Sequence, residues 1–198
     1  GSEICGLSAA LALKENRTLI KPFDSTHVIS GQGTAALEVI EAEKNNKKFD
    51  AAIICTSGGG LTAGTSIVLK NHNPNCKIYT AEPAAWNDHQ QSFLANKRIY
   101  IKDIEHGICD ALESPFPGII TFAINNKNKV KGLSVDDTEI IEAMRFAYEE
   151  FNFILEPSGA IALACLRSAK IKFKDKKILI ILSGGNISKD RFYKYIAR

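Results

Sequence analysis

The stretch AAIICTSGGGLTAG, residues 51–64, decides the fold class of this chain. Its first five residues are apolar, which predicts a short strand buried on both faces, because a strand covered by helices has no solvent side for polar residues. Glycines follow at once, and the small residues after them predict a helix. The N–H groups of such a turn converge on an anion without interference from Cβ atoms, and the helix adds its positive end. The stretch therefore predicts a strand, a phosphate-binding turn and a helix.

A second apolar run, residues 178–182, also predicts a buried strand and also ends in glycines, in the sequence SGGN at 183–186. Residues 77–81 and 99–101 predict further strands, and helices are expected at 34–44, 61–70, 136–151 and 157–169. Within 136–151, Asp136 and Glu139 have capping-box spacing, and a stripe is formed by Ile140, Met144, Ala147 and Phe151. Strands that alternate with helices predict an α/β fold with a mostly parallel twisted sheet flanked by helices.

The N-terminal part of the chain predicts a boundary. Residues 1–22 indicate one helix and a strand at 18–21, and Pro22-Phe23-Asp24 then predicts a turn at which the chain crosses between domains. The residues 113–118, ESPFPG, predict a rigid loop.

Composition excludes several classes of protein. The 198 residues are 45% hydrophobic with a net charge of +3 and no sustained basic face, so nucleic-acid binding is not expected. No apolar run reaches the roughly 20 residues that span a bilayer, so no membrane segment is expected. The five cysteines are scattered and lack a C-x-x-C pair, which argues against disulfides or zinc and favours a reducing cytoplasm. The histidines lack metal spacing and are interpreted as surface or turn residues: His27, His72, His89 and His106.

Two known phosphate-binding motifs can be compared with the first turn. Gly58, Gly60 and Ala63 satisfy the dinucleotide fingerprint G-x-G-x-x-[GA], with Glu82 about 20 residues further on. A P-loop is excluded, because no Gly-Lys-Ser/Thr follows. Ligands of parallel sheets bind at the carboxyl ends of strands, so two glycine turns at that edge predict one cofactor held at two points. A dinucleotide explains only the first of these turns.

The order of five motifs resembles a known family. The motifs that carry the resemblance are GQGT at 31–34, SGGGL at 57–61, EP at 82–83 with ND at 87–88, EPSGA at 156–160 and SGGN at 183–186. With these motifs the chain resembles the threonine/serine dehydratases and serine racemases, which are pyridoxal-phosphate enzymes of fold type II. The resemblance covers the whole chain. Most of these relatives have a fourth glycine where this chain has Ser57, whose N–H is still available. The resemblance implies that residues 1–32 end a small domain and that 33–198 form a large cofactor-binding domain.

The resemblance also implies the roles of individual residues. Ser57, Gly58, Gly59, Gly60 and Leu61 are expected to hold the cofactor phosphate, Ser183 to face the pyridine nitrogen, and Gly184 and Glu156 to lie near the ring. A neutral hydroxyl cannot keep that nitrogen protonated as a carboxylate would, which favours β-elimination over reactions that need a long-lived carbanion.

Further expectations concern a metal and a thiol. Glu82 and Asp88, with the backbone carbonyl of Trp86, match a pattern by which several relatives hold a divalent cation, and hard oxygen ligands suit Mg²⁺ or Ca²⁺. A solvated acidic loop is the alternative. Cys55, beside the first turn, is interpreted as a buried structural thiol.

The lysine that these enzymes bond to the cofactor lies in an N-terminal Ser-Phe-Lys motif, which is absent here. The chain is therefore expected to correspond to the C-terminal part of an L-serine or L-threonine ammonia-lyase, to contain no catalytic residue itself and to be inactive alone, with a homodimer expected for the intact enzyme. Three alternatives stay open: serine racemase activity, an NAD-binding Rossmann-like domain, and a non-catalytic homologue.

Overall fold

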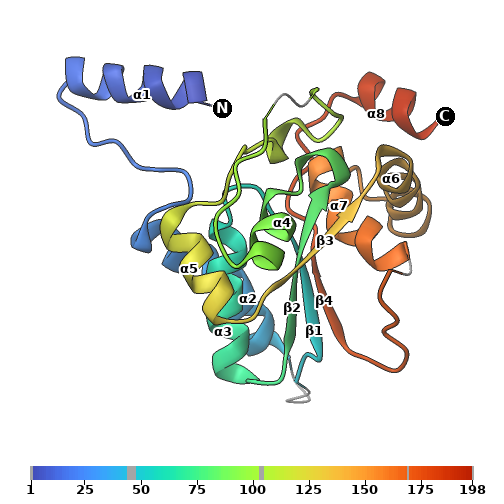
Figure 1. Ribbon diagram of the computed structural model, residues 1–198. Helices are drawn as coiled ribbons and strands as arrows, with labels where there is room; N and C mark the ends of the chain where they lie inside the picture. Colours follow the sequence, from blue (N-terminus) through green and yellow to red (C-terminus); the bar gives the residue numbers. More distant parts are fainter. Residues whose placement is uncertain (1, 44–47, 103–104, 169, 198) are drawn as a thin grey trace.

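The computed structural model describes residues 2–43, 48–102, 105–168 and 170–197. Four parallel strands form one sheet in the order β3-β2-β1-β4: β1 is Ala51–Cys55, β2 Lys77–Pro83, β3 Lys131–Val135 and β4 Ile178–Ile181. Helices cover both faces of this sheet (Figure 1). The α/β fold with a parallel, helix-flanked sheet is therefore confirmed.

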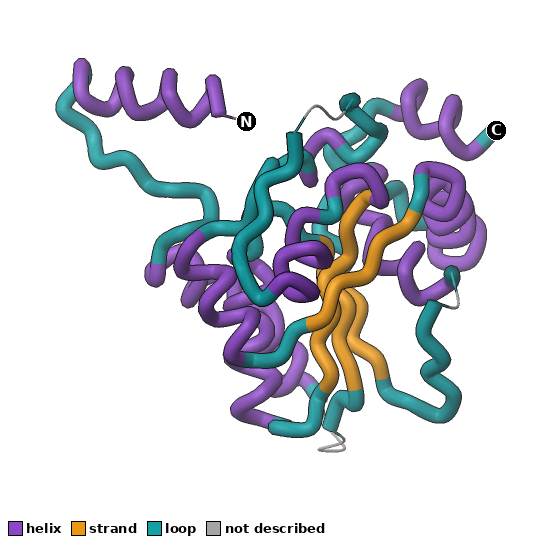
Figure 2. The backbone as a smooth tube through the Cα atoms, viewed as in Figure 1, coloured by secondary structure: helices purple, strands orange, loops and turns teal. Residues whose placement is uncertain are grey.

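The two faces of the sheet follow from the alternation of side chains along β1. Ala51, Ile53 and Cys55 point into one core cluster, and Ala52 and Ile54 point into the other. Because both sets of side chains are buried, β1 needs an apolar residue at every position. Figure 2 shows the strands between two layers of helix.

One layer contains α2 (Thr26–Ala42), α3 (Gly60–His72) and α5 (Ile119–Lys127), and the other contains α6 (Asp137–Phe151), α7 (Pro157–Arg167) and α8 (Lys189–Ile196). Helix α4 (Asp88–Ala95) packs on β2 and β3. The short helices η1 (Ala84–Trp86) and η2 (Asp110–Leu112) lie in the connections that follow β2.

Most predicted elements are confirmed, with shifted ends. The predicted helices at 61–70 and 136–151 correspond to α3 and α6, and the side chain of Asp136 accepts from the N–H of Glu139 in a complete capping box. The helix predicted at 34–44 begins earlier, at Thr26, and that at 157–169 ends by Arg167; residues 44 and 169 lie outside the described residues. Of the predicted stripe on α6, Ile140, Met144 and Ala147 are buried, whereas Phe151 is 55% exposed at the end of the helix.

Two strand predictions are wrong, and one strand was not predicted. Residues 18–21 and 99–101 are loops, and their apolar residues only imitate short strands. The structure adds β3, which sequence analysis missed because an edge strand needs few apolar residues and KGLSV contains only two, Leu133 and Val135. Strand β4 is confirmed but only half-buried, because it is the other edge of the sheet.

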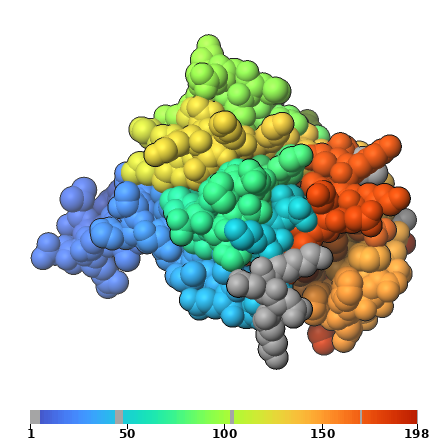
Figure 3. Space-filling model, turned by 90° about the horizontal axis from the view of Figure 1, so that it is seen from below, coloured from blue at the N-terminus to red at the C-terminus, as the bar shows by residue number. Residues whose placement is uncertain are grey.

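Helix α1 (Ser2–Lys14) stands away from the sheet and is joined to α2 by an extended connection (Figures 1 and 2). The space-filling view shows the N-terminal segment projecting from the body of the molecule (Figure 3). The predicted division at residue 32 stays a prediction, and α2 runs through that residue without a break. Among the described residues, no helix has the length and apolar character to cross a membrane.

Candidate phosphate and cofactor site

The first glycine turn joins β1 to α3 at the carboxyl edge of the sheet. Gly59 has a φ of 92°, in the left-handed region that favours glycine, and α3 begins at the next residue. The hydroxyl of Thr56 donates to the carbonyl of Ile54 at 2.8 Å and lies 2.6 Å from the hydroxyl of Thr62 in α3. The turn is therefore tied to both the strand before it and the helix after it.

Three side chains hold three successive carbonyl groups of this turn. Nε2 of His89 lies 2.8 Å from the carbonyl of Ser57, Thr121 Oγ1 donates to Gly58 at 2.6 Å, and Asn125 Nδ2 donates to Gly59 at 3.3 Å. These donors come from α4 and α5, which pack together where Phe93 stacks on Phe122. All three donors therefore approach the turn from the α4–α5 side.

This arrangement determines where the N–H groups of the turn point. In a planar trans peptide the carbonyl of one residue and the N–H of the next point in opposite directions. Holding the three carbonyls toward α4 and α5 therefore turns the N–H groups of Gly58, Gly59 and Gly60 the other way. Among the described residues, these three N–H groups have no backbone acceptor. Free N–H groups at a helix N-terminus form an anion site, so the residues present fit a phosphate.

The interpretation of His89 as a surface or turn residue is wrong, because it is buried in α4. Its side chain is fully buried, and burial lowers the pKa of the imidazole to about 4, so the ring is neutral at pH 7. Since the carbonyl of Ser57 only accepts, we assign the ring proton to Nε2. The sequence does not reveal this role, because the place of His89 in the first turn of α4 does not tell which group its imidazole contacts.

The GQGT motif and the Pro22-Phe23-Asp24 turn lie against the same loop. A Cβ atom built on Gly58 would come within 2.3 Å of the Phe23 ring, and one on Gly60 within 2.3 Å of Oε1 of Gln32. The Asp24 carboxylate accepts from the N–H of Ile120 at 2.8 Å and so caps α5, which carries Thr121 and Asn125. Asp24 and Ile120, 96 positions apart, thus help to support one turn, and the space at Gly58 and Gly60 is filled by Phe23 and Gln32.

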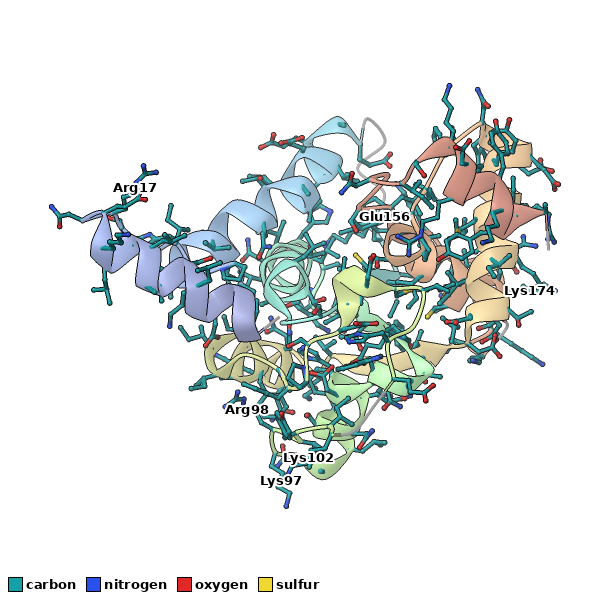
Figure 4. The ribbon with its side chains drawn as sticks, turned by 90° about the horizontal axis from the view of Figure 1, so that it is seen from above. Arg17, Lys97, Arg98, Lys102, Glu156 and Lys174 are labelled. Atoms are coloured by element: carbon teal, nitrogen blue, oxygen red, sulfur yellow. The ribbon has the colours of Figure 1, made fainter. Side chains whose placement is uncertain are left out.

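The second glycine turn lies beside the first, because β4 is the neighbour of β1. Cys55 Sγ is 2.8 Å from Ser183 Oγ, and the N–H of Glu156 donates to the carbonyl of Gly184 at 3.2 Å. A Cβ atom on Gly184 would lie 1.9 Å from Oε1 of Glu156, so a larger residue here would displace the Glu156 carboxylate. Figure 4, seen from the edge at which the strands end, shows Glu156 near the middle of the view, between the two layers of helix. The structure therefore brings together Ser183, Gly184 and Glu156.

The predicted cation site differs from an ordinary ligand cluster. Glu82 is fully buried and accepts from the hydroxyl of Thr80 and from the N–H groups of His89 and Gln90. Neither carboxylate oxygen of Asp88 has a hydrogen-bond partner among the described residues. Burial raises the pKa of both carboxyl groups, that of Asp88 to about 8, and the charge of Asp88 raises the pKa of Glu82 further.

These features do not support a metal site. Within the described ranges, no group of three or more His, Cys, Asp and Glu side chains is arranged to hold a metal ion. Trp86 directs its indole N–H to the carbonyl of Glu105 at 3.2 Å. The expectation of Mg²⁺ or Ca²⁺ at Glu82, Trp86 and Asp88 is therefore not supported, and neither is a solvated acidic loop, because both carboxyl groups are buried.

Fold and site together define an α/β protein with an anion-binding turn and a second glycine turn at the carboxyl edge of a parallel sheet. Comparison with known proteins specifies the family. Residues 3–184 match the family described as pyridoxal-phosphate dependent enzymes, and the chain belongs to this family.

Individual relatives agree with this assignment. The chain is 35% identical to a serine racemase of Schizosaccharomyces pombe, over 97% of this chain and 58% of the racemase, and 34% identical to an L-threo-3-hydroxyaspartate ammonia-lyase of a Pseudomonas species, over 94% and 57%. The crystal structure of serine racemase from Dictyostelium discoideum superposes with a TM-score of 0.80 at 37% identity, covering 92% of this chain and 58% of that one. The chain thus spans a little over half the length of these relatives, which include both racemases and ammonia-lyases.

Proposed function

We propose that this chain supplies the cofactor-binding surface of a pyridoxal-phosphate ammonia-lyase that acts on L-serine or L-threonine. The observation that carries the proposal is the first glycine turn, whose carbonyls are held by His89, Thr121 and Asn125 so that three N–H groups, which have no backbone acceptor in the described part of the chain, face away from α4 and α5. In this proposal residues 57–61 bind the cofactor phosphate at the positive end of α3.

The second turn provides the contacts to the cofactor ring in this proposal. Ser183 is solvent-exposed at the end of β4, beside the first turn, so its hydroxyl is accessible to a ring nitrogen. Gly184 and Glu156 lie next to it and border the ring. When bound, pyridoxal phosphate supplies the electron sink that stabilises the carbanion formed by loss of the α-proton of the amino acid. A neutral Ser183 leaves that sink weak, which favours rapid departure of a β-hydroxyl.

The Ser-Phe-Lys motif, whose lysine such enzymes need for covalent attachment and proton transfer, does not occur in this sequence, so we assign that role to none of its residues. We therefore expect the chain alone to bind the cofactor and release no 2-oxo acid. The lyase activity itself belongs to a polypeptide that includes such a lysine, and for it we propose a homodimer in the cytoplasm.

A binding experiment tests the cofactor site directly. Trp86 is the single tryptophan of the chain and lies in η1, three residues before His89, which contacts the first turn, so its fluorescence should be quenched by pyridoxal phosphate. Inorganic phosphate should compete, and NAD should have no effect. Tight binding of NAD without binding of pyridoxal phosphate would overturn the proposal and favour a dinucleotide site.

Serine racemase activity is the second candidate, because relatives at 35% and 37% identity carry that name. A native enzyme that includes the lysine should convert L-serine or L-threonine to equal amounts of 2-oxo acid and ammonia. Formation of D-serine without 2-oxo acid would assign it to the racemases instead.

A further inference from the structure

The thiol of Cys55 lies between the two glycine turns and contacts one side chain of the proposed ring site. Cys55 ends β1, and the preceding residue, Ile54, pairs with Ile181 of β4, so the ends of the two strands are adjacent. The Sγ atom of Cys55 lies 2.8 Å from Oγ of Ser183, and this is the only side-chain hydrogen bond of that thiol among the described residues. The contact therefore links the first strand end to the group proposed to face the ring nitrogen.

The surroundings of Cys55 keep its thiol protonated. The residue is only 6% exposed, and burial raises the pKa of its thiol, while the negative charge of Glu156 acts in the same direction. The hydrogen bond to Ser183 opposes this shift only in part. At neutral pH the Sγ atom therefore carries one proton, for which the oxygen of Ser183 is the available acceptor.

We propose that Cys55 is a positioning residue for Ser183: its S–H donates to Oγ of Ser183, so that the hydroxyl proton of Ser183 is directed at a ring nitrogen that carries no proton. This inference rests on the proposed cofactor site. A hydroxyl has one proton to donate and two lone pairs that accept. With one lone pair engaged by the thiol, the O–H becomes a better donor and the oxygen a poorer acceptor, because hydrogen bonds in a chain polarise one another.

The consequence concerns the protonation of the ring nitrogen. A Ser183 that freely accepts would stabilise a protonated nitrogen, whereas a Ser183 that donates stabilises an unprotonated one. Cys55 therefore helps to keep the electron sink weak, which is the property that favours β-elimination. Removing the thiol should raise the protonated fraction of a bound ring by at most about fivefold, the limit set by the energy of one whole neutral hydrogen bond.

A first experiment measures the thiol itself, without cofactor. The Raman S–H stretching band of Cys55 is isolated as the difference between the unmodified chain and Cys55→Ala. The same band without its acceptor is the difference between Ser183→Ala and the double variant. The S–H stretch of a thiol that donates a hydrogen bond lies at a lower wavenumber, so the first band should lie below the second. Coincident bands would overturn the proposed direction of the hydrogen bond.

A second experiment measures the ring nitrogen with pyridoxine 5′-phosphate, which binds without forming a covalent bond and whose absorption spectrum reports its protonation. The titration midpoint of the bound analogue should move upward in Cys55→Ala and return in Cys55→Ser, which restores a donor. Cys76→Ala is the matched control, because Cys76 is buried in the core cluster on the opposite face of the sheet. Circular dichroism verifies that each variant is folded.

The outcomes separate this inference from the proposed function. Binding of the analogue with the same midpoint in the unmodified chain and in Cys55→Ala would overturn the role of Cys55 alone. If the unmodified chain binds no analogue, the proposed cofactor site fails, and the role of Cys55 toward the ring fails with it.

Discussion

Replacing Thr121 with valine tests whether the side chains behind the first turn prepare it for an anion. Valine keeps the shape of threonine and removes the hydroxyl that donates to the carbonyl of Gly58 at 2.6 Å. That carbonyl keeps a second donor, the N–H of Gly118 at 3.2 Å, so it is not left without a partner. The loss is then one neutral hydrogen bond, about 1 kcal/mol of the free energy of unfolding, which lowers the Tm of a chain of this size by roughly 2–4 °C.

The same hydrogen bond should also affect the affinity of the turn for phosphate. If its energy serves to hold the N–H groups in place, its loss weakens binding of pyridoxal phosphate by up to about fivefold, since 1.4 kcal/mol corresponds to a factor of ten. Isothermal titration calorimetry with pyridoxal phosphate and with inorganic phosphate measures this change, and both ligands should weaken alike because they share the phosphate.

The matched control is Thr18→Val, at an exposed threonine in the connection after α1. It should change neither Tm nor affinity. A Thr121→Val chain with lowered Tm and unchanged affinity for both ligands would refute the reasoning, because Thr121 would then only stabilise the fold.

Three further predictions concern other parts of the molecule. Gly59→Ala should lower the free energy of unfolding, measured by urea titration, by at least about 2 kcal/mol, because the φ of Gly59 is 92° and the new methyl group would lie 2.6 Å from the buried imidazole of His89. The control Gly31→Ala, in open space on α2, should be neutral or stabilising. With chelator present, the free energy of unfolding should fall as the pH rises from about 4 to 8. The reason is that the Asp88 carboxyl group, whose pKa is raised to about 8 in the folded chain, keeps its proton there but loses it in the unfolded chain. Asp88→Asn should therefore reduce this dependence on pH. The thiols of Cys76 and Cys165, with pKa values raised to about 11 and 12, should react with Ellman's reagent only after unfolding, so rapid labelling of either in the native chain would contradict their burial.

The amount that could be predicted differs between the centre and the edges of the sheet. The central strand β1 is apolar at every position and was identified at its observed bounds, because burial on both faces leaves no other composition. The sequence does not predict the edge strand β3 and wrongly predicts a strand at the loop 99–101, because a short half-exposed strand and an apolar loop have similar sequences. Helix α6 was predicted well, since the capping box that starts it is local.

The sequence by itself determines the α/β class and the two glycine turns, and the order of its motifs indicates the pyridoxal-phosphate family. These features depend on residues close together in the chain or on a periodic pattern, so the sequence alone can predict them. Only the tertiary structure placed His89, Thr121 and Asn125 behind the first turn and Cys55 against Ser183. Those contacts join residues between 32 and 128 positions apart, and the pairing of strands and packing of helices that bring them together leave no pattern in the sequence between them.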